Sequence, residues 1–206
     1  MKLTAVLESW HLPDGNYPPL HRDQLVNLSF EVEPSVLSKT STRPERFDQI
    51  VDANCKFTGT VLRVYDDSSN SPIVVIQAGA FKFYINSFPK EAPLLVEGDK
   101  CEGQGKLLLD HYIWVEFRST YQDPPDLFHS FRVTKIRSVK IPEKFISRYE
   151  KGMSGPASMP HGEYSNDGIT EIEKMAATDD RGWLFYLVDL DDSTVGSSAV
   201  PLTFHS

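Results

Sequence analysis

Five short runs rich in β-favouring residues lie in the middle of this chain, and they limit its fold more than any other feature. The runs cover residues 55–65, 72–77, 81–85, 100–109 and 112–117. Turn-forming residues such as Asp, Ser, Asn and Gly separate them. Five short strands in close succession are what a small closed β-barrel needs. We therefore predict a mainly β fold with little helix.

Alternation along these runs predicts which side chains point out of the barrel. Phe57, Phe81 and Phe83 are expected inside, and Gly59 is expected to hold a bulge that changes the phase of the first strand. The outward set then combines aromatic rings with cations: Arg63, Tyr65, Lys82, Tyr84, Tyr112 and Trp114. Rings beside cations suit stacked bases or a protein partner. The alternative is that another part of the chain covers this face.

The strand order, the early glycine and the Val-Glu-Gly-Asp-Lys approach to the fourth strand at 96–100 resemble an OB-fold over residues 55–117. The resemblance is one of architecture. It implies a five-stranded OB-like barrel that binds oligonucleotides, oligosaccharides or proteins on the face of its second and third strands.

The flanks of the barrel predict β-hairpins. We expect one compact unit, because neither flank has enough apolar residues for a core of its own. Its expected parts are an N-terminal hairpin and loop (1–50), the OB-like core (51–141), a short helix and flexible loop (142–168) and an acidic C-terminal hairpin (169–206).

Acidic residues are concentrated at the C-terminal end of the chain. The net charge is −8, and residues 151–206 hold three Lys or Arg against nine Asp or Glu. This balance disfavours a general nucleic-acid binder and is compatible with a basic protein partner. The predicted contact residues of the hairpin are Asp179, Asp180, Asp189, Asp191 and Asp192. The alternative is that these carboxylates serve turns and solubility.

A run of cations extends from Arg132 to Arg148, and it too has two possible roles. It either contacts an acidic ligand or pairs with the acidic tail of the same chain.

The chain carries no sign of export or of a membrane span. Lys2 and Glu8 interrupt the first ten residues, and no apolar stretch is long enough to cross a bilayer. The only two cysteines are Cys55 and Cys101. Two cysteines without an export signal favour a reducing cytoplasm, although a disulfide between them stays open.

Motifs for chemistry are missing from the sequence. The six histidines are scattered without metal-ligand spacing, and the glycines at 152 and 155 are not spaced as in a nucleophile elbow. We expect no catalytic residue, no metal site and no cofactor.

Three function classes remain. The first is a non-enzymatic, cytoplasmic protein-binding module, for example an inhibitor or immunity-type protein that neutralises a basic partner. The second is an OB-like protein that binds single-stranded nucleic acid through Tyr65, Tyr84 and Trp114, against which the net charge argues. The third is an enzyme whose site has no linear motif.

Overall fold

The computed structural model describes residues 1–8, 11–12, 18–41, 43–65, 72–110, 113–114, 118–140, 169–176 and 184–192. By their contacts they form two units. Unit 1 comprises Met1–Asn27 and Ser130–Ser206, and unit 2 comprises Leu28–His129. The predicted helix and loop at 142–168 lie outside the described residues.

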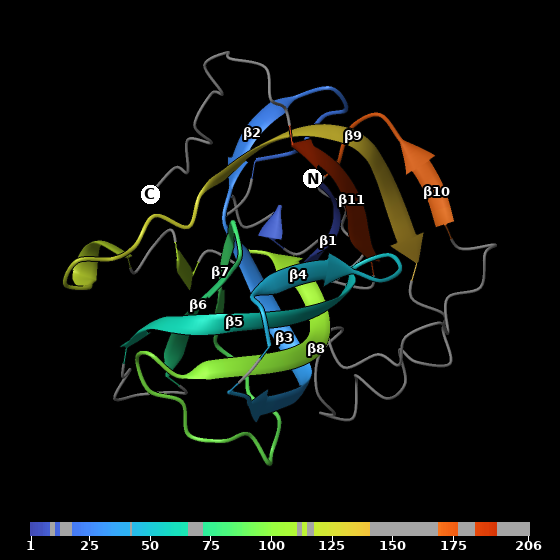
Figure 1. The fold of residues 1–206 in the computed structure, drawn as a ribbon. Coiled ribbons are helices and arrows are strands. Elements are labelled where there is room, and N and C mark those ends of the chain that lie inside the picture. The colour runs from blue at the N-terminus through green and yellow to red at the C-terminus, as the bar shows by residue number, and fades with distance from the viewer. Residues whose placement is uncertain are drawn as a thin grey trace, which may run out of the picture. The chain divides into compact units, whose positions relative to one another are not determined.

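Unit 2 is a closed five-stranded barrel, which confirms the predicted architecture (Figure 1). Around the ring each strand pairs with the next, and the last pairs with the first. The ring is made of β5 (Asn54–Tyr65), β6 (Ile73–Ala78), β7 (Phe81–Ile85), β3 (Phe30–Lys39) and β8 (Lys100–Leu109). A short strand, β4 (Arg46–Gln49), pairs with β5 outside the ring.

The strand that closes the ring corrects the prediction for residues 112–117. Ile113 and Trp114, the described residues of that stretch, have helical backbone. The fifth position is taken by β3, which precedes the other four in sequence. It runs antiparallel to β8 and parallel to β7, where Glu31 pairs with Tyr84. The barrel is therefore a circular permutation of the expected strand order.

Aromatic rings fill the barrel interior as the alternation predicts. The ring centroids of Phe57 and Phe83 are 5.0 Å apart, and those of Phe30 and Phe81 are 5.2 Å apart. Opposite them β8 carries glycine, because a Cβ at Gly105 would lie 2.1 Å from the carbonyl oxygen of Glu33. The close approach of β3 to β8 therefore depends on a residue without a side chain.

The irregularity in β5 lies later than predicted. Its register against β6 shifts between Val61 and Arg63, not at Gly59. After this shift, Leu62 packs against the apolar cluster on the outer face. Gly59 is needed for a different reason, since a Cβ there would lie 2.5 Å from the carbonyl oxygen of Gln77.

Cys55 and Cys101 are free and buried, without a disulfide between them. Cys55 belongs to β5 and Cys101 belongs to β8 of the barrel. Burial raises the pKa of each thiol from 9.0 to about 12. They are therefore protonated core side chains at neutral pH.

Unit 1 is a β-sheet in the order β10-β9-β11-β1, and β2 also pairs with β9. Its strands are β1 (Lys2–Glu8), β2 (Leu25–Leu28), β9 (His129–Lys140), β10 (Ile169–Ile172) and β11 (Leu184–Asp192). Neither predicted hairpin forms. The strands β10 and β11 lie on opposite sides of β9, and β1 pairs with β11.

A hairpin was expected because strands that follow one another usually pair. In unit 1 the long strand β9 intervenes, and β11 is buried over Phe185–Val188, so that both its faces are covered. No helix in the described part of the chain is both long and apolar enough to span a membrane.

Candidate functional site

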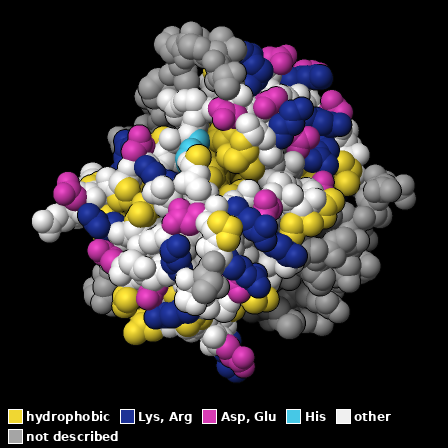
Figure 2. Space-filling model, in the orientation of Figure 1, with side chains coloured by type: hydrophobic (Ala, Val, Ile, Leu, Met, Phe, Trp, Pro, Cys, Tyr) yellow, Lys and Arg dark blue, Asp and Glu magenta, His cyan; other side chains and the backbone are white. Residues whose placement is uncertain are grey.

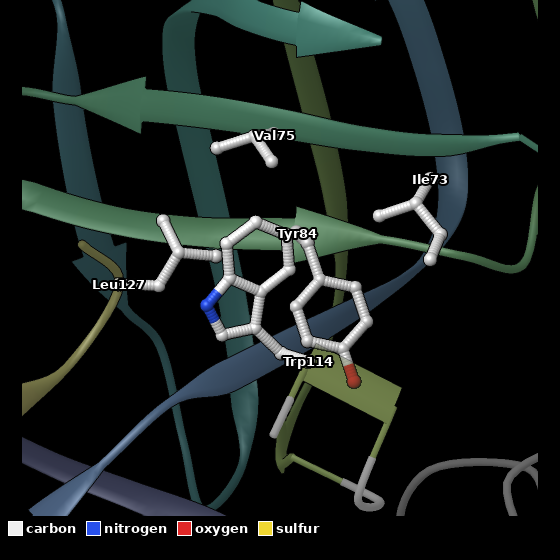
Figure 3. Packing of buried hydrophobic residues seen from close by; sticks show 5 residues of the cluster. All are labelled: Ile73, Val75, Tyr84, Trp114 and Leu127. Carbon is white, nitrogen blue, oxygen red and sulfur yellow. The ribbon is translucent and has the colours of Figure 1, made fainter. Parts of the chain in front are cut away.

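The outer face of β6 and β7 carries an apolar cluster (Figure 3). Tyr84 points outward from the barrel as predicted, but it is 0% exposed, and Trp114 is 1% exposed. The indole of Trp114 lies between Leu127 and the ring of Tyr84 (Figure 3). We call the described residues between 113 and 128 the cover segment, because they close this face.

Ring contacts extend the closure to the edge of the face. The ring centroids of Tyr84 and Trp114 are 6.2 Å apart with nearly parallel planes. At the rim Tyr65 of β5 stacks on Tyr121 of the cover segment, with centroids 4.2 Å apart. Arg118, in the short 3₁₀ helix η2 (Arg118–Thr120), lies 4.8 Å above the ring of Phe128. The rings predicted to bind a ligand therefore contact the protein's own chain.

A buried polar cluster holds the cover segment in place. The Tyr84 hydroxyl donates to Asp110 Oδ1 at 2.7 Å, and Glu31 Oε2 lies 3.3 Å from the same hydroxyl. Asp110 also accepts from the Trp114 backbone N–H at 3.1 Å and from the Ser29 hydroxyl at 2.8 Å. Burial, and then the charges of Asp110 and Glu31, raise the pKa of Tyr84 well above 10. Tyr84 is thus a neutral donor to acidic neighbours.

The predicted ring-and-cation surface is therefore corrected for Tyr84 and Trp114, which offer no accessible ring. Arg63 is half exposed and forms an ion pair with Glu97 at 3.3 Å. The Lys82 ammonium donates to the Asp126 carbonyl at 3.3 Å. Tyr112 lies outside the described residues. The structure brings Tyr65, Tyr84 and Trp114 together, but as a core.

The acidic residues of the predicted hairpin are partly engaged within unit 1. Asp189 accepts from Arg137 at 2.8 Å and from the Thr4 hydroxyl at 2.7 Å. Asp192 lies 3.5 Å from the N-terminal ammonium, and Asp191 is half-buried. Asp179 and Asp180 are outside the described residues.

Two cations of β9 pair with acidic residues of the same chain, which is the second alternative given for this run. Lys135 pairs with Glu171 of β10 at 2.7 Å, and Arg137 pairs with Asp189 of β11. These two side chains therefore form ion pairs inside unit 1.

An apolar groove of about 680 Å³ lies at one end of the barrel. Val64 of β5 and Val74 of β6 are opposite each other in the ladder, on the face that alternates with the outward Ile73 and Val75. They reach the groove from the interior side of the barrel, and the connector between β7 and β8 forms the other wall. The lining residues are Val64, Pro72, Val74, Phe88, Pro89, Ala92, Pro93, Leu94, Leu95, Val96 and Glu97.

The connector presents apolar side chains to solvent at this groove. Leu95 is 4% exposed and anchors the connector, whereas Leu94 is 81% and Val96 51% exposed. Proline at 89 and 93 fixes backbone φ, which restricts the connector on either side of Ala92. Among the described residues that line the groove, Glu97 is the one with a charged side chain. Large exposed apolar side chains in a concave site are typical of binding surfaces.

The sequence did not predict this groove. The usable signal was the run Pro93-Leu94-Leu95-Val96, which is apolar in a segment predicted to be a surface loop. Alternation within it places one side chain inside and two outside.

Comparisons with protein-family models, with curated proteins and with solved structures find no match to this chain. Among the described residues there is no group of three or more His, Cys, Asp or Glu placed to hold a metal ion.

Proposed function

We propose that this protein is a non-enzymatic, cytoplasmic protein-binding module that docks an apolar segment of its partner in the groove beside Leu94 and Val96. The exposure of these two side chains next to a groove of about 680 Å³ is the observation that supports the proposal most strongly. An apolar anchor in such a pocket is the usual centre of a protein interface.

A protein segment fits the groove better than a small ligand does. Small-molecule sites bury most of the surface of their ligand. Here Leu94 and Val96 line the groove and are exposed to solvent, so they would contact a partner that extends beyond the groove. The partner is proposed to be basic overall, because the net charge of −8 would speed its association. An inhibitor or immunity-type role is one form of such a module.

The free thiols support the cytoplasmic part of the proposal. Cys55 and Cys101 remain unbridged in the barrel, which suits a reducing compartment. Nucleic acid is the weaker alternative, because two of the three rings proposed to stack on bases, those of Tyr84 and Trp114, are buried.

The test compares proteins captured from a lysate by the wild-type chain and by Leu94→Asp/Val96→Asp. Both residues are exposed, so the substitutions should leave the barrel folded. The matched control is Val51→Asp, which changes an apolar side chain that is 60% exposed outside the groove. We expect one protein that the wild type and the control retain and the groove variant loses, with weaker capture at high salt.

Retention of the same proteins by the groove variant, or loss of the partner by the Val51 control as well, would contradict the proposal. Purified partner and chain should then show the same ranking in a direct binding measurement.

A further inference from the structure

A second concave site lies on the outer face of the barrel where β4, β5, β8 and β3 run side by side. It is a hollow of about 300 Å³. Because β4, β5 and β8 pair in register, Arg46 lies opposite Thr58, and Thr58 lies opposite Glu102. The lining residues are Val36, Ser38, Arg43, Arg46, Lys56, Phe57, Thr58, Glu102, Gly103 and Gln104.

Hydrogen-bond donors dominate this hollow, although the chain as a whole is acidic. Among the described residues, three cations (Arg43, Arg46 and Lys56) and one carboxylate (Glu102) line it. Figure 2 shows Lys and Arg side chains gathered over β4, β5 and β8, with acidic side chains between them. The hydroxyls of Ser38 and Thr58 and the amide of Gln104 add uncharged donors.

The two arginines keep donors free after their ion pairs are counted. Arg43 Nη1 lies 2.7 Å from Glu102 Oε2, and Arg46 Nε lies 3.2 Å from Asp48 Oδ2. A guanidinium has five N–H donors, so each retains several. The Lys56 ammonium has no ion-pair partner among the described residues.

We propose that this hollow is an anion site that takes the phosphate group of a small phosphorylated ligand. Guanidinium forks match the geometry of phosphate oxygens, and charge-assisted hydrogen bonds of this kind are the strong ones. Phosphate is favoured over carboxylate because two guanidiniums, one ammonium and two hydroxyls offer more donors than one carboxylate accepts. A volume of about 300 Å³ suits a small ligand.

The site is separate from the apolar groove, since no described residue lines both. Failure of one proposal therefore leaves the other intact.

The test is an NMR titration of the full chain with inorganic pyrophosphate at about 50 mM salt, where exposed charges are least screened. We expect saturable shifts of the Thr58, Gly103 and Gln104 amides. The variant Arg43→Gln/Lys56→Gln should bind about tenfold more weakly, because two of three cations are gone. The matched control is Lys2→Gln/Lys90→Gln, which removes two exposed cations elsewhere and should keep wild-type affinity.

Shifts that spread over the surface without saturation, or an equal loss in the control variant, would overturn the proposal, because both indicate a response to net charge alone. Parallel titration with a single-stranded oligonucleotide separates the sources of phosphate. Much tighter binding of the oligonucleotide at the same amides would overturn the small-ligand assignment in favour of a polymer.

Discussion

Two outer faces of the same barrel differ in their exposure to solvent. On β6 and β7 the outward residues are Ile73, Val75 and Tyr84, and the cover segment buries them. On β5 and β8 the outward residues include Lys56, Glu102 and Gln104, and that face stays open to solvent as the hollow. Pointing out of a barrel is therefore not the same as being exposed. The apolar or charged character of the outward set decides whether another segment covers it.

The largest expected effect comes from removing the centre of the covered face. Trp114→Ala should lower the free energy of unfolding by about 3–5 kcal/mol, because it leaves a cavity beside Tyr84 and Leu127. Urea denaturation followed by circular dichroism measures it. The control Leu94→Ala removes a side chain that is 81% exposed and should cost below about 0.5 kcal/mol. Equal effects of the two would contradict the assignment of the covered face.

Tyr84→Phe tests the polar cluster beneath the cover segment. The ring stays, but Asp110 and Glu31 lose the hydroxyl that they share. Loss of one hydrogen bond to a buried acceptor costs about 1–3 kcal/mol, although Asp110 keeps the donors of Trp114 and Ser29. The same denaturation curves give the value. A loss no larger than that of an exposed Tyr would show that water reaches these carboxylates.

The pH dependence of that loss follows from the pKa of Tyr84, which is raised well above 10 in the folded chain. Below pH 10 the tyrosine is protonated in both states, and its contribution is complete. Above pH 10 the unfolded chain releases the Tyr84 proton while the folded chain keeps it, so the wild type loses a contribution to stability that the Phe variant never had. The gap between them should shrink by about 1.4 kcal/mol per pH unit. A gap that is constant from pH 9 to 11 would place Tyr84 in contact with solvent.

The smallest effect is expected on the open face. Lys56→Ala removes an exposed cation without an ion pair among the described residues, and should change the free energy of unfolding by less than about 0.5 kcal/mol. A cost above about 2 kcal/mol in the same urea titration would mean that this face, too, is covered.

The sequence predicts much of this barrel because its strands alternate. The inward rings Phe57, Phe81 and Phe83 and the outward direction of Tyr84 all follow from a period of two. Ring closure does not follow, since alternation identifies a strand but not its partner. The strand β3 was therefore assigned to a hairpin, and Ile113 and Trp114 to the ring.

The site was harder to predict than the fold, for related reasons. Whether Trp114 is exposed depends on contacts with Leu127 and Tyr84, which no local pattern contains. The hollow joins Arg43 and Glu102 from distant parts of the chain through strand register. The groove depends on which side of the connector Leu94 faces, and a loop has no period that would reveal it.

The closure of the β6–β7 face is central to this structure, and the groove and the hollow are two sites that stay open among the described residues of the barrel. Acrylamide quenching of Trp114 in the variant Trp10→Phe/Trp183→Phe measures that closure directly. We predict blue-shifted emission and weak quenching that becomes strong only in urea. Emission typical of an indole in water, quenched as readily in the native chain as in urea, would contradict the account.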